Sequence, residues 1–371
     1  MADELASLPA GEGVEAAHWA LAIPEDRRRH LRVWLWSGAC LTFLIIVVGG
    51  VTRLTQSGLS IVDWDPIVGV IPPLSDPDWS EAFRRYQQFP EYQKLRQGMT
   101  LGEFRFIYFW EYTHRLLARL VGVAFLIPLV FFSWRRYLTR PLFLRVSLLF
   151  GLGALQGFMG WFMVSSGLVD DPRVSHYRLA AHFAIALTIL GSCVWLARAL
   201  GPDRLRSLGA RPLRGSSRAA LWLLGGLLIL QVLWGALVAG LDAGLIFNSF
   251  PRMGDGLIPP GAWQMRPRAL NLLENPATVQ WVHRLLGTLL LVASLAVFAR
   301  HRARSSGIFA ALVTVQYGLG VATLLQRVPV ALGVAHQGTA VLIVACWLLW
   351  LQTSITARER EGIGLAGHIN G

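Results

Sequence analysis

The sequence has few charged residues and almost no lysine. Only 15% of its 371 residues are charged, whereas soluble globular proteins carry about 25%. Lys94 is the single lysine, so arginine supplies nearly all of the positive charge. Together with a hydrophobic content of 54% and a mean hydropathy of +0.48, this shortage excludes an ordinary soluble domain and indicates an integral membrane protein.

Cysteine is also scarce. Cys40, Cys193 and Cys346 are the only three; each lies inside an apolar run, and none belongs to a CxxCH motif. The sequence therefore predicts neither a disulfide framework nor a covalently attached c-type haem. The net charge of +12 arises from arginines between long apolar segments, so it indicates membrane topology rather than binding of nucleic acid.

Long apolar segments are abundant, and each can span a bilayer as a helix at about 1.5 Å per residue. The first is longer than the apolar core of a cleaved signal peptide. We therefore predict an all-α integral membrane protein with eight transmembrane helices, near residues 33–52, 107–133, 144–165, 178–199, 219–240, 278–299, 307–325 and 330–351.

Arginine clusters predict the orientation of the chain. They occur before the first predicted helix and in the loops after the second, fourth and sixth, as with Arg135 and Arg136 or Arg300 and Arg302. The positive-inside rule places these segments in the cytoplasm. Both termini are then cytoplasmic, and we expect a multi-pass protein of a bacterial inner membrane.

Short motifs recur along the chain. THRLLARL from Thr113 matches VHRLLGTL from Val282, and LQGFMG from Leu155 resembles VQYGLG from Val315. Four spans return the chain to its starting side, so repeated halves share one orientation and a pseudo-twofold axis along the membrane normal. We predict two pseudo-twofold-related four-helix bundles, with boundaries at 33–199 and 219–351, a cytoplasmic linker at 200–218, and tails at 1–32 and 352–371.

The first outer loop, 53–106, is long and rich in turn residues. Within it, the run from Ser80 to Leu95 has the spacing of a short amphipathic helix that is interrupted at Pro90. We expect the loop to fold as a cap over the outer face. The alternative is a flexible, solvated loop, since loops of this length are either functional or disordered.

Four of the nine histidines occupy equivalent places in the two halves: His114, His182, His283 and His336. We expect each to lie a turn or two inside the outward end of its helix. A histidine within a span is costly and usually faces the bundle interior. Two at one depth in each half favour two bis-histidine haem sites. The alternatives are histidines that hydrogen-bond a neighbour, and zinc, which needs three or four ligands at one point.

Arg115 and Arg284 directly follow two of these histidines. Arginine pairs well with carboxylates, so both are candidate partners of haem propionates; the alternative is an arginine that snorkels to the interface. Gln156 and Gln316 either orient the sites or form interhelical hydrogen bonds. The sequence assigns no role to the other histidines, which are His18, His30, His176 (placed in a loop), His301 and His368.

One carboxylate distinguishes the halves. Glu111 lies three residues before His114, on the same helical face, whereas the matching Gln280 carries no charge. This asymmetry marks the first half as the working site and the second as an electron-transfer site. Glu111 is a candidate general acid or base, or a stabiliser of positive charge. The alternative is an interface carboxylate paired with Arg115 or Arg119.

Several motifs resemble those of a known family. They are GGVTRLTQSGLSIVDW from Gly49, FRRYQQFPEYQK from Phe83 and FIYFWEYTHR from Phe106, followed by WVHRLLGTL and AHQGTAV. These are similar to haem A synthase, most closely its alphaproteobacterial and mitochondrial branch, over roughly residues 32–351. Some relatives carry a cysteine pair in the first outer loop, and this sequence has none there.

The resemblance implies an activity and its residues. The family oxidises the C8 methyl of haem O to a formyl group by two successive hydroxylations, which gives haem A for cytochrome c oxidase. His114 and His182 would bind haem O, His283 and His336 would bind a haem B cofactor, and the family's glutamate falls on Glu111. With two histidines on iron, no position is open to dioxygen. Oxidation would then remove electrons and protons from the methyl, and water would attack the resulting cation.

The resemblance also implies candidate partners: haem O synthase (the farnesyltransferase that makes haem O), cytochrome oxidase assembly factors, membrane lipid and a second copy of the chain. The residues alone leave two other functions open. A dihaem b-type electron-transfer protein linked to quinone needs neither Glu111 nor an elaborate loop. A transporter places polar groups at mid-depth, whereas here they gather at the outer end.

Overall fold

The computed structural model describes residues 19–20, 22–62, 68–167, 172–201 and 216–369. Within these residues, eight helices are long and apolar enough to cross a membrane, which confirms the predicted spans and the all-α membrane fold. They are α2 (Glu25–Leu54), α5 (Leu101–Trp134), α6 (Arg140–Gly167), α7 (His176–Ala199), α9 (Ser216–Gly240), α10 (Pro276–His301), α11 (Arg304–Leu325) and α12 (Val330–Ile369).

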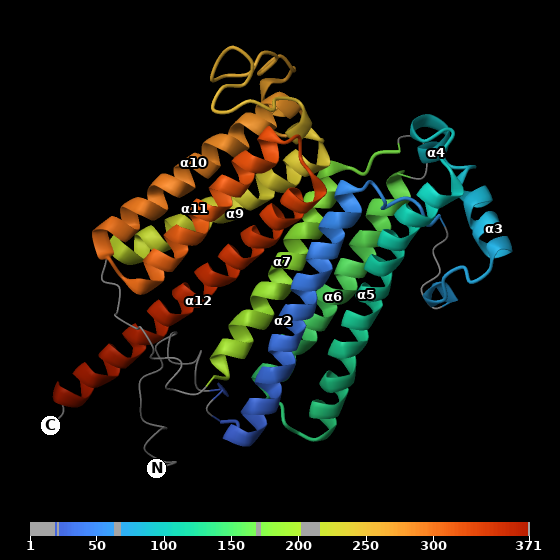
Figure 1. The fold of residues 1–371 in the computed structure, drawn as a ribbon. Helices are drawn as coiled ribbons and strands as arrows, with labels where there is room; N and C mark the ends of the chain where they lie inside the picture. The colour runs from blue at the N-terminus through green and yellow to red at the C-terminus, as the bar shows by residue number, and fades with distance from the viewer. Residues whose placement is uncertain (1–18, 21, 63–67, 168–171, 202–215, 370–371) are drawn as a thin grey trace.

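The eight helices form two groups that follow each other in the chain (Figure 1). In the first, α2 packs on α5 and α7, and α6 packs on α7 and α5. In the second, α10 packs on α9 and α11, and α11 packs on α12. The groups meet where α7 lies against α9 and α12, and where α12 lies against α2. The twofold relation between the halves and their boundaries stay predictions.

Three helices extend beyond their apolar runs. α2 begins at Glu25 rather than Val33, and α12 continues past Leu351 to Ile369, so the expected tails 1–32 and 352–371 are partly helical. Arg and Glu, which are frequent after Ala357, have high helix propensity. α5 begins at Leu101 because Thr100 and Glu103 form a reciprocal capping box, which contributes about 1 kcal/mol.

The first outer loop packs against α5, as expected for a cap. It contains η2 (Val68–Val70), α3 (Asp76–Tyr86) and α4 (Pro90–Leu95), so the predicted amphipathic helix is interrupted at Pro90. Tyr86 and Phe104 are fully buried there, with ring centroids 5.2 Å apart. Aromatic pairs of this kind add about 0.5–1.5 kcal/mol to the free energy of burial. We call α3 and α4 the cap, and the end of the bundle that carries it the cap end.

The second outer loop lies at the same end (Figure 1) and contains η3 (Ala243–Leu245) and η4 (Arg268–Leu272). The structure corrects the expected place of His176, which begins α7 rather than lying in a loop. Its Nε2 lies 3.6 Å from the Glu274 carboxylate. The neighbouring Tyr177 donates its hydroxyl to Glu274 at 2.6 Å. These contacts tie α7 to the second outer loop, because both residues face the same carboxylate.

Candidate functional site

The four repeated histidines lie toward the cap end of four different helices. His182, His283 and His336 lie about two turns inside the starts of α7, α10 and α12, as expected. His114 lies deeper within α5 than expected, since the capped start of that helix reaches into the loop layer. The helices that carry them, α5, α7, α10 and α12, come from both groups.

The histidines are arranged as two pairs. The rings of His283 and His336 have centroids 6.5 Å apart and are nearly perpendicular, at 82°. His114 and His182 lie within electrostatic range of each other. Each pair therefore joins two helices of one group, α10 with α12 and α5 with α7. Two imidazoles on facing helices are the ligand set that a bis-histidine haem uses.

A glycine on the neighbouring helix makes room for each imidazole ring. A Cβ placed on that glycine would lie 2.8–3.3 Å from the ring's Cε1, which is tighter than ordinary van der Waals contact, so a side chain there would crowd the histidine. The four pairs are Gly49 with His114 at 3.0 Å, Gly160 with His182 at 3.3 Å, Gly235 with His283 at 3.0 Å, and Gly320 with His336 at 2.8 Å.

Glutamines stand beside three of the rings. The Nε2 atom of Gln156 lies 3.1 Å from Nε2 of His182, and that of Gln316 lies 3.4 Å from Nε2 of His336. Both contacts cross between helices, and Gln316 also donates to the backbone carbonyl of His336 at 2.9 Å; that these glutamines orient a site stays a prediction. The sequence reading missed Gln231, whose Nε2 lies 3.4 Å from Nε2 of His283. Its signal is weak, because it is one polar residue in an apolar run without a counterpart in the first half.

These features fit a haem at each pair. The Nδ1 atom of each ring is buried and makes no hydrogen bond that meets ordinary distance and angle limits, which is unusual for a buried polar atom. Because the facing residues are glycines, no side chain from the neighbouring helix crowds the imidazole rings. Among the described residues, no group of three or more His, Cys, Asp or Glu side chains converges on one point. The pairs therefore suit an iron that takes two axial ligands better than a zinc ion.

Glu111 is buried in α5, with 2% of its surface exposed. One oxygen, Oε2, accepts hydrogen bonds from the Ser60 hydroxyl at 2.7 Å and the Ile61 backbone N–H at 2.8 Å. The other, Oε1, accepts from the Arg115 guanidinium at 2.6 Å. Three donors therefore fix the orientation of this carboxylate one turn from His114. The expected pairing with Arg115 is present, and burial distinguishes Glu111 from an ordinary interface residue.

Gln280 occupies the matching place in the second half. It is equally buried, with 2% of its surface exposed, and its amide donates to the Phe247 carbonyl at 3.1 Å. The chemistry is therefore inverted between the halves. Glu111 presents a negative acceptor to the loop, whereas Gln280 presents a neutral donor.

Arg115 and Arg284 bind loop carbonyls in this structure. Arg115 donates to Ile61 at 2.8 Å, and Arg284 donates to Phe247 at 2.7 Å and to Ser249 at 2.8 Å. Each arginine thus fastens an outer loop over the histidine that precedes it. Their expected contact with haem propionates stays a prediction.

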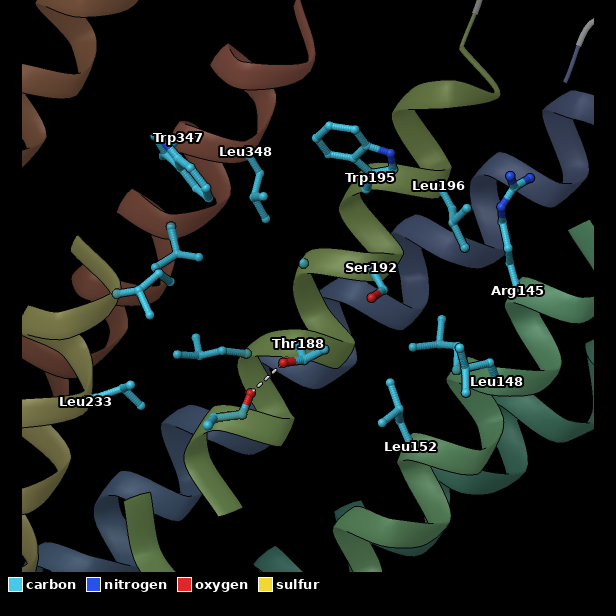
Figure 2. A pocket seen from close by; sticks show the side chains of 16 residues that line it. Arg145, Leu148, Leu152, Thr188, Ser192, Trp195, Leu196, Leu233, Trp347 and Leu348 are labelled. Carbon is cyan, nitrogen blue, oxygen red and sulfur yellow. Dashed lines mark hydrogen bonds between the residues drawn. The ribbon is translucent and has the colours of Figure 1, made fainter. Parts of the chain in front are cut away.

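An apolar groove of about 530 Å³ runs along α7, between α6 and the neighbouring α9 and α12 (Figure 2). Leu152 and Trp347 belong to its apolar walls, and Thr188 and Ser192 lie on α7 between them. Arg145 marks one end. None of the four paired histidines belongs to the lining residues. The groove is therefore separate from the histidine sites, and its composition suits a hydrocarbon chain.

Fold and sites together define a helical multi-pass membrane protein with two paired-histidine sites of the kind that bind haem. Residues 32–348 match the model of the COX15-CtaA family, described as "Cytochrome oxidase assembly protein". The chain belongs to this family.

Proteins named heme A synthase are similar along most of the chain. The one from Sinorhizobium medicae (strain WSM419) is 46% identical over 329 residues, covering 86% of this chain and 88% of the relative. The one from Bradyrhizobium sp. (strain ORS 278) is 44% identical, covering 85% and 88%. The one from Nitrosospira multiformis is 43% identical, covering 87% and 93%. These likenesses confirm the resemblance drawn from the sequence motifs.

Proposed function

We propose that this chain is a haem A synthase that oxidises the C8 methyl of haem O to a formyl group. The name shared by its relatives supports the activity. The single observation that carries the assignment of the working half is the buried carboxylate of Glu111 beside His114, opposite the neutral Gln280 of the other half. A carboxylate buried beside only one of two similar sites is expected where charge or a proton is handled.

In this proposal the two pairs have different occupants. His114 and His182 hold the substrate haem O, and His283 and His336 hold a haem B cofactor. Haem B, when bound, supplies one-electron transfer. A Cβ on Gly49 or Gly235 would stand equally close to the rings of His114 and His283, at 3.0 Å in both halves, so we place the difference between the halves at the loop ends.

Glu111 is the proposed catalytic residue. Each hydroxylation removes two electrons and one proton from the methyl carbon, and the water that attacks this carbon loses a second proton as it becomes the hydroxyl; the electrons pass to an external one-electron acceptor. The second hydroxylation gives a gem-diol that loses water to form the aldehyde. A fixed carboxylate stabilises positive charge at that carbon and accepts a proton from it. The Ser60 hydroxyl and the Ile61 N–H hold the carboxylate in place, so little reorganisation is needed during the reaction.

The location and partners belong to the same proposal. The arginine pattern places both termini in the cytoplasm of a bacterial inner membrane. The start of α2 and the end of α12 lie at the end of the bundle opposite the cap (Figure 1), which agrees with a common side for both. Haem O synthase and cytochrome oxidase assembly factors are the proposed partners, because they precede and follow this step. A homo-oligomer is a further candidate.

Extraction and chromatography of the haems bound to the purified protein test the proposal. Wild type should contain haem B together with haem O or haem A. The variant His283→Ala should lose haem B selectively and retain haem O, since only the second pair is broken. His176→Ala is the matched control, because this histidine contacts Glu274 and lies outside both pairs; its haem content should equal that of wild type.

Haem B alone, at two per chain in cells that make haem O, would contradict the proposal. It would favour the dihaem electron-transfer protein and leave Glu111 as an ion-pair partner of Arg115.

A further inference from the structure

Glu91, on α4 of the cap, is a buried carboxyl group outside the histidine sites. Only 5% of its surface is exposed, and the fully buried Tyr86 adjoins it. Its Oε1 lies 3.3 Å from Nε of Arg96, while Oε2 is buried and makes no hydrogen bond of ordinary geometry. A buried carboxylate with incomplete partners is costly, so its presence in an outer loop requires a physical reason.

Arg96 links Glu91 to the end of α2. Its Nη2 donates to the Gln56 carbonyl at 2.8 Å and lies 3.4 Å from the Thr55 carbonyl. Gln56 has a φ of 51°, a left-handed conformation that residues with a side chain rarely adopt. The ion pair therefore holds Arg96 where it stabilises an uncommon backbone conformation directly after the first transmembrane helix.

From this turn, hydrogen bonds continue to Glu111. The hydroxyls of Thr55 and Ser57 lie 2.6 Å apart. The Ser60 hydroxyl lies 3.1 Å from the Ser57 carbonyl and 2.7 Å from Oε2 of Glu111. The Ile61 N–H donates to the same oxygen at 2.8 Å. Residues 55–61 thus form a continuous polar connection from the cap to the buried carboxylate of α5.

We propose that Glu91 is a positioning residue for Glu111: its ion pair with Arg96 holds residues 55–61 in the conformation that fixes the Glu111 carboxylate. The inference rests on the proposed function and adds to it a residue that touches neither haem. Loss of the ion pair releases the Gln56 turn, and the two donors on Ser60 and Ile61 then shift away from Glu111.

The charge of Glu91 changes near neutral pH. Burial raises its pKa to about 7; Arg96 and the Tyr86 hydroxyl oppose this shift, and the charge of Glu111 adds to it. These three are the charged and titratable groups that face it from α3, from the segment after α4 and from α5. Above its pKa, Glu91 is an anion that pairs with Arg96. Below its pKa, the neutral acid pairs with it weakly, so positioning is lost as the pH falls.

The test is the initial rate of haem A formation by the full-length protein between pH 5.5 and 8.5. The wild-type rate should rise about tenfold from pH 6 to pH 8, as the ionised fraction of one group with a pKa near 7 does. Glu91→Gln should be slow and flat across this range. Glu81→Gln is the matched control on α3, because Arg84 and Arg85 hold the pKa of the exposed Glu81 to about 2.

A second variant and a second measurement guard against misfolding. Arg96→Gln should reproduce the flat profile, and the double variant should lose no more than either single one. Protection factors for amide hydrogen exchange of residues 55–61, which correct for the intrinsic pH dependence of exchange, should fall below pH 7 in wild type and in Glu81→Gln but not change with pH in Glu91→Gln.

The inference would be overturned by a wild-type pH profile in Glu91→Gln, or by protection of residues 55–61 that does not change with pH in wild type. Absence of haem A from wild type at every pH would instead refute the proposed function, and the exchange data would still decide the role of Glu91.

Discussion

The loop ends of the two helix groups share one contact. In the first group Arg115 donates to the backbone carbonyl of Ile61, and in the second Arg284 donates to that of Phe247. Each arginine follows a paired histidine, and each carbonyl belongs to the loop after the first helix of its group. The shared contact is therefore structural, since it fastens a loop over a histidine in both groups.

The same loops differ in the residue that meets them from the histidine-bearing helix. Glu111 accepts the Ile61 N–H, whereas Gln280 donates to the Phe247 carbonyl. Replacement of a carboxylate by an amide preserves size and burial but reverses hydrogen-bond polarity and removes a charge. The comparison identifies one buried position at which the two histidine-bearing helices differ in charge and in hydrogen-bond polarity.

The strongest way to break the comparison is to make the first half resemble the second. Glu111→Gln should retain bound haem, because the histidines and glycines are untouched, and should lower haem A formation by about 100-fold or more, the usual contribution of a general acid or base. Haem stoichiometry and product are measured on the same sample. Gln280→Ala is the control and should keep product formation within a few-fold of wild type. Full activity in Glu111→Gln, or equal losses in both variants, would refute the asymmetry.

A graded loss of haem should follow from the glycine contacts. The Cβ of Gly320→Ala would lie 2.8 Å from His336, and that of Gly160→Ala 3.3 Å from His182. Overpacking costs about 1–3 kcal/mol, so haem binding at the second pair should weaken on the order of tenfold in Gly320→Ala and less at the first pair in Gly160→Ala. Gly153→Ala, where the Cβ meets nothing within 4 Å, is the control. Haem titration measures the two affinities. A larger loss of affinity in Gly160→Ala than in Gly320→Ala would contradict the prediction.

The sequence predicted the spans and the four histidines because both depend on local patterns. A long apolar run predicts a membrane-spanning helix without reference to other segments. The histidines were found because the motifs that begin at Thr113 and Val282 have similar sequences. The prediction that Glu111 distinguishes the two halves came from the same alignment of motifs; the structure shows that Glu111 is buried, and its role stays a prediction. These features need no knowledge of which distant residues meet.

The remaining features depend on contacts between distant segments. Glu91 reads as one more acidic residue in a polar loop, and its burial arises only when α4 packs beside Tyr86 and Arg96 reaches back to Gln56. Gln231 has no partner in the repeat to mark it. The start of α5 is set by a capping box rather than by hydropathy, so the apolar run alone predicted a helix that begins too late.

The smallest expected effect concerns the contact between the groups at the cap end. Arg53 of α2 pairs with Asp242 at 2.8 Å and also donates to the Ala239 carbonyl at 2.6 Å. The side chains are 25% and 46% exposed, and a pair this accessible contributes about 0.2–1 kcal/mol. Asp242 has a φ of 50°, which asparagine tolerates. Asp242→Asn should therefore lower the free energy of unfolding by about 0.5 kcal/mol and leave haem A formation unchanged.

Thermal unfolding in detergent at low and high salt measures this difference, which should shrink at high salt because exposed charges are screened. Asp255→Asn, at an exposed position of the second outer loop, is the control and should match wild type. A loss above about 2 kcal/mol would exceed what a surface pair supplies. It would mean that the two helix groups depend on the Arg53–Asp242 pair for their alignment. The contact between the groups would then influence the first half in addition to the difference at Glu111.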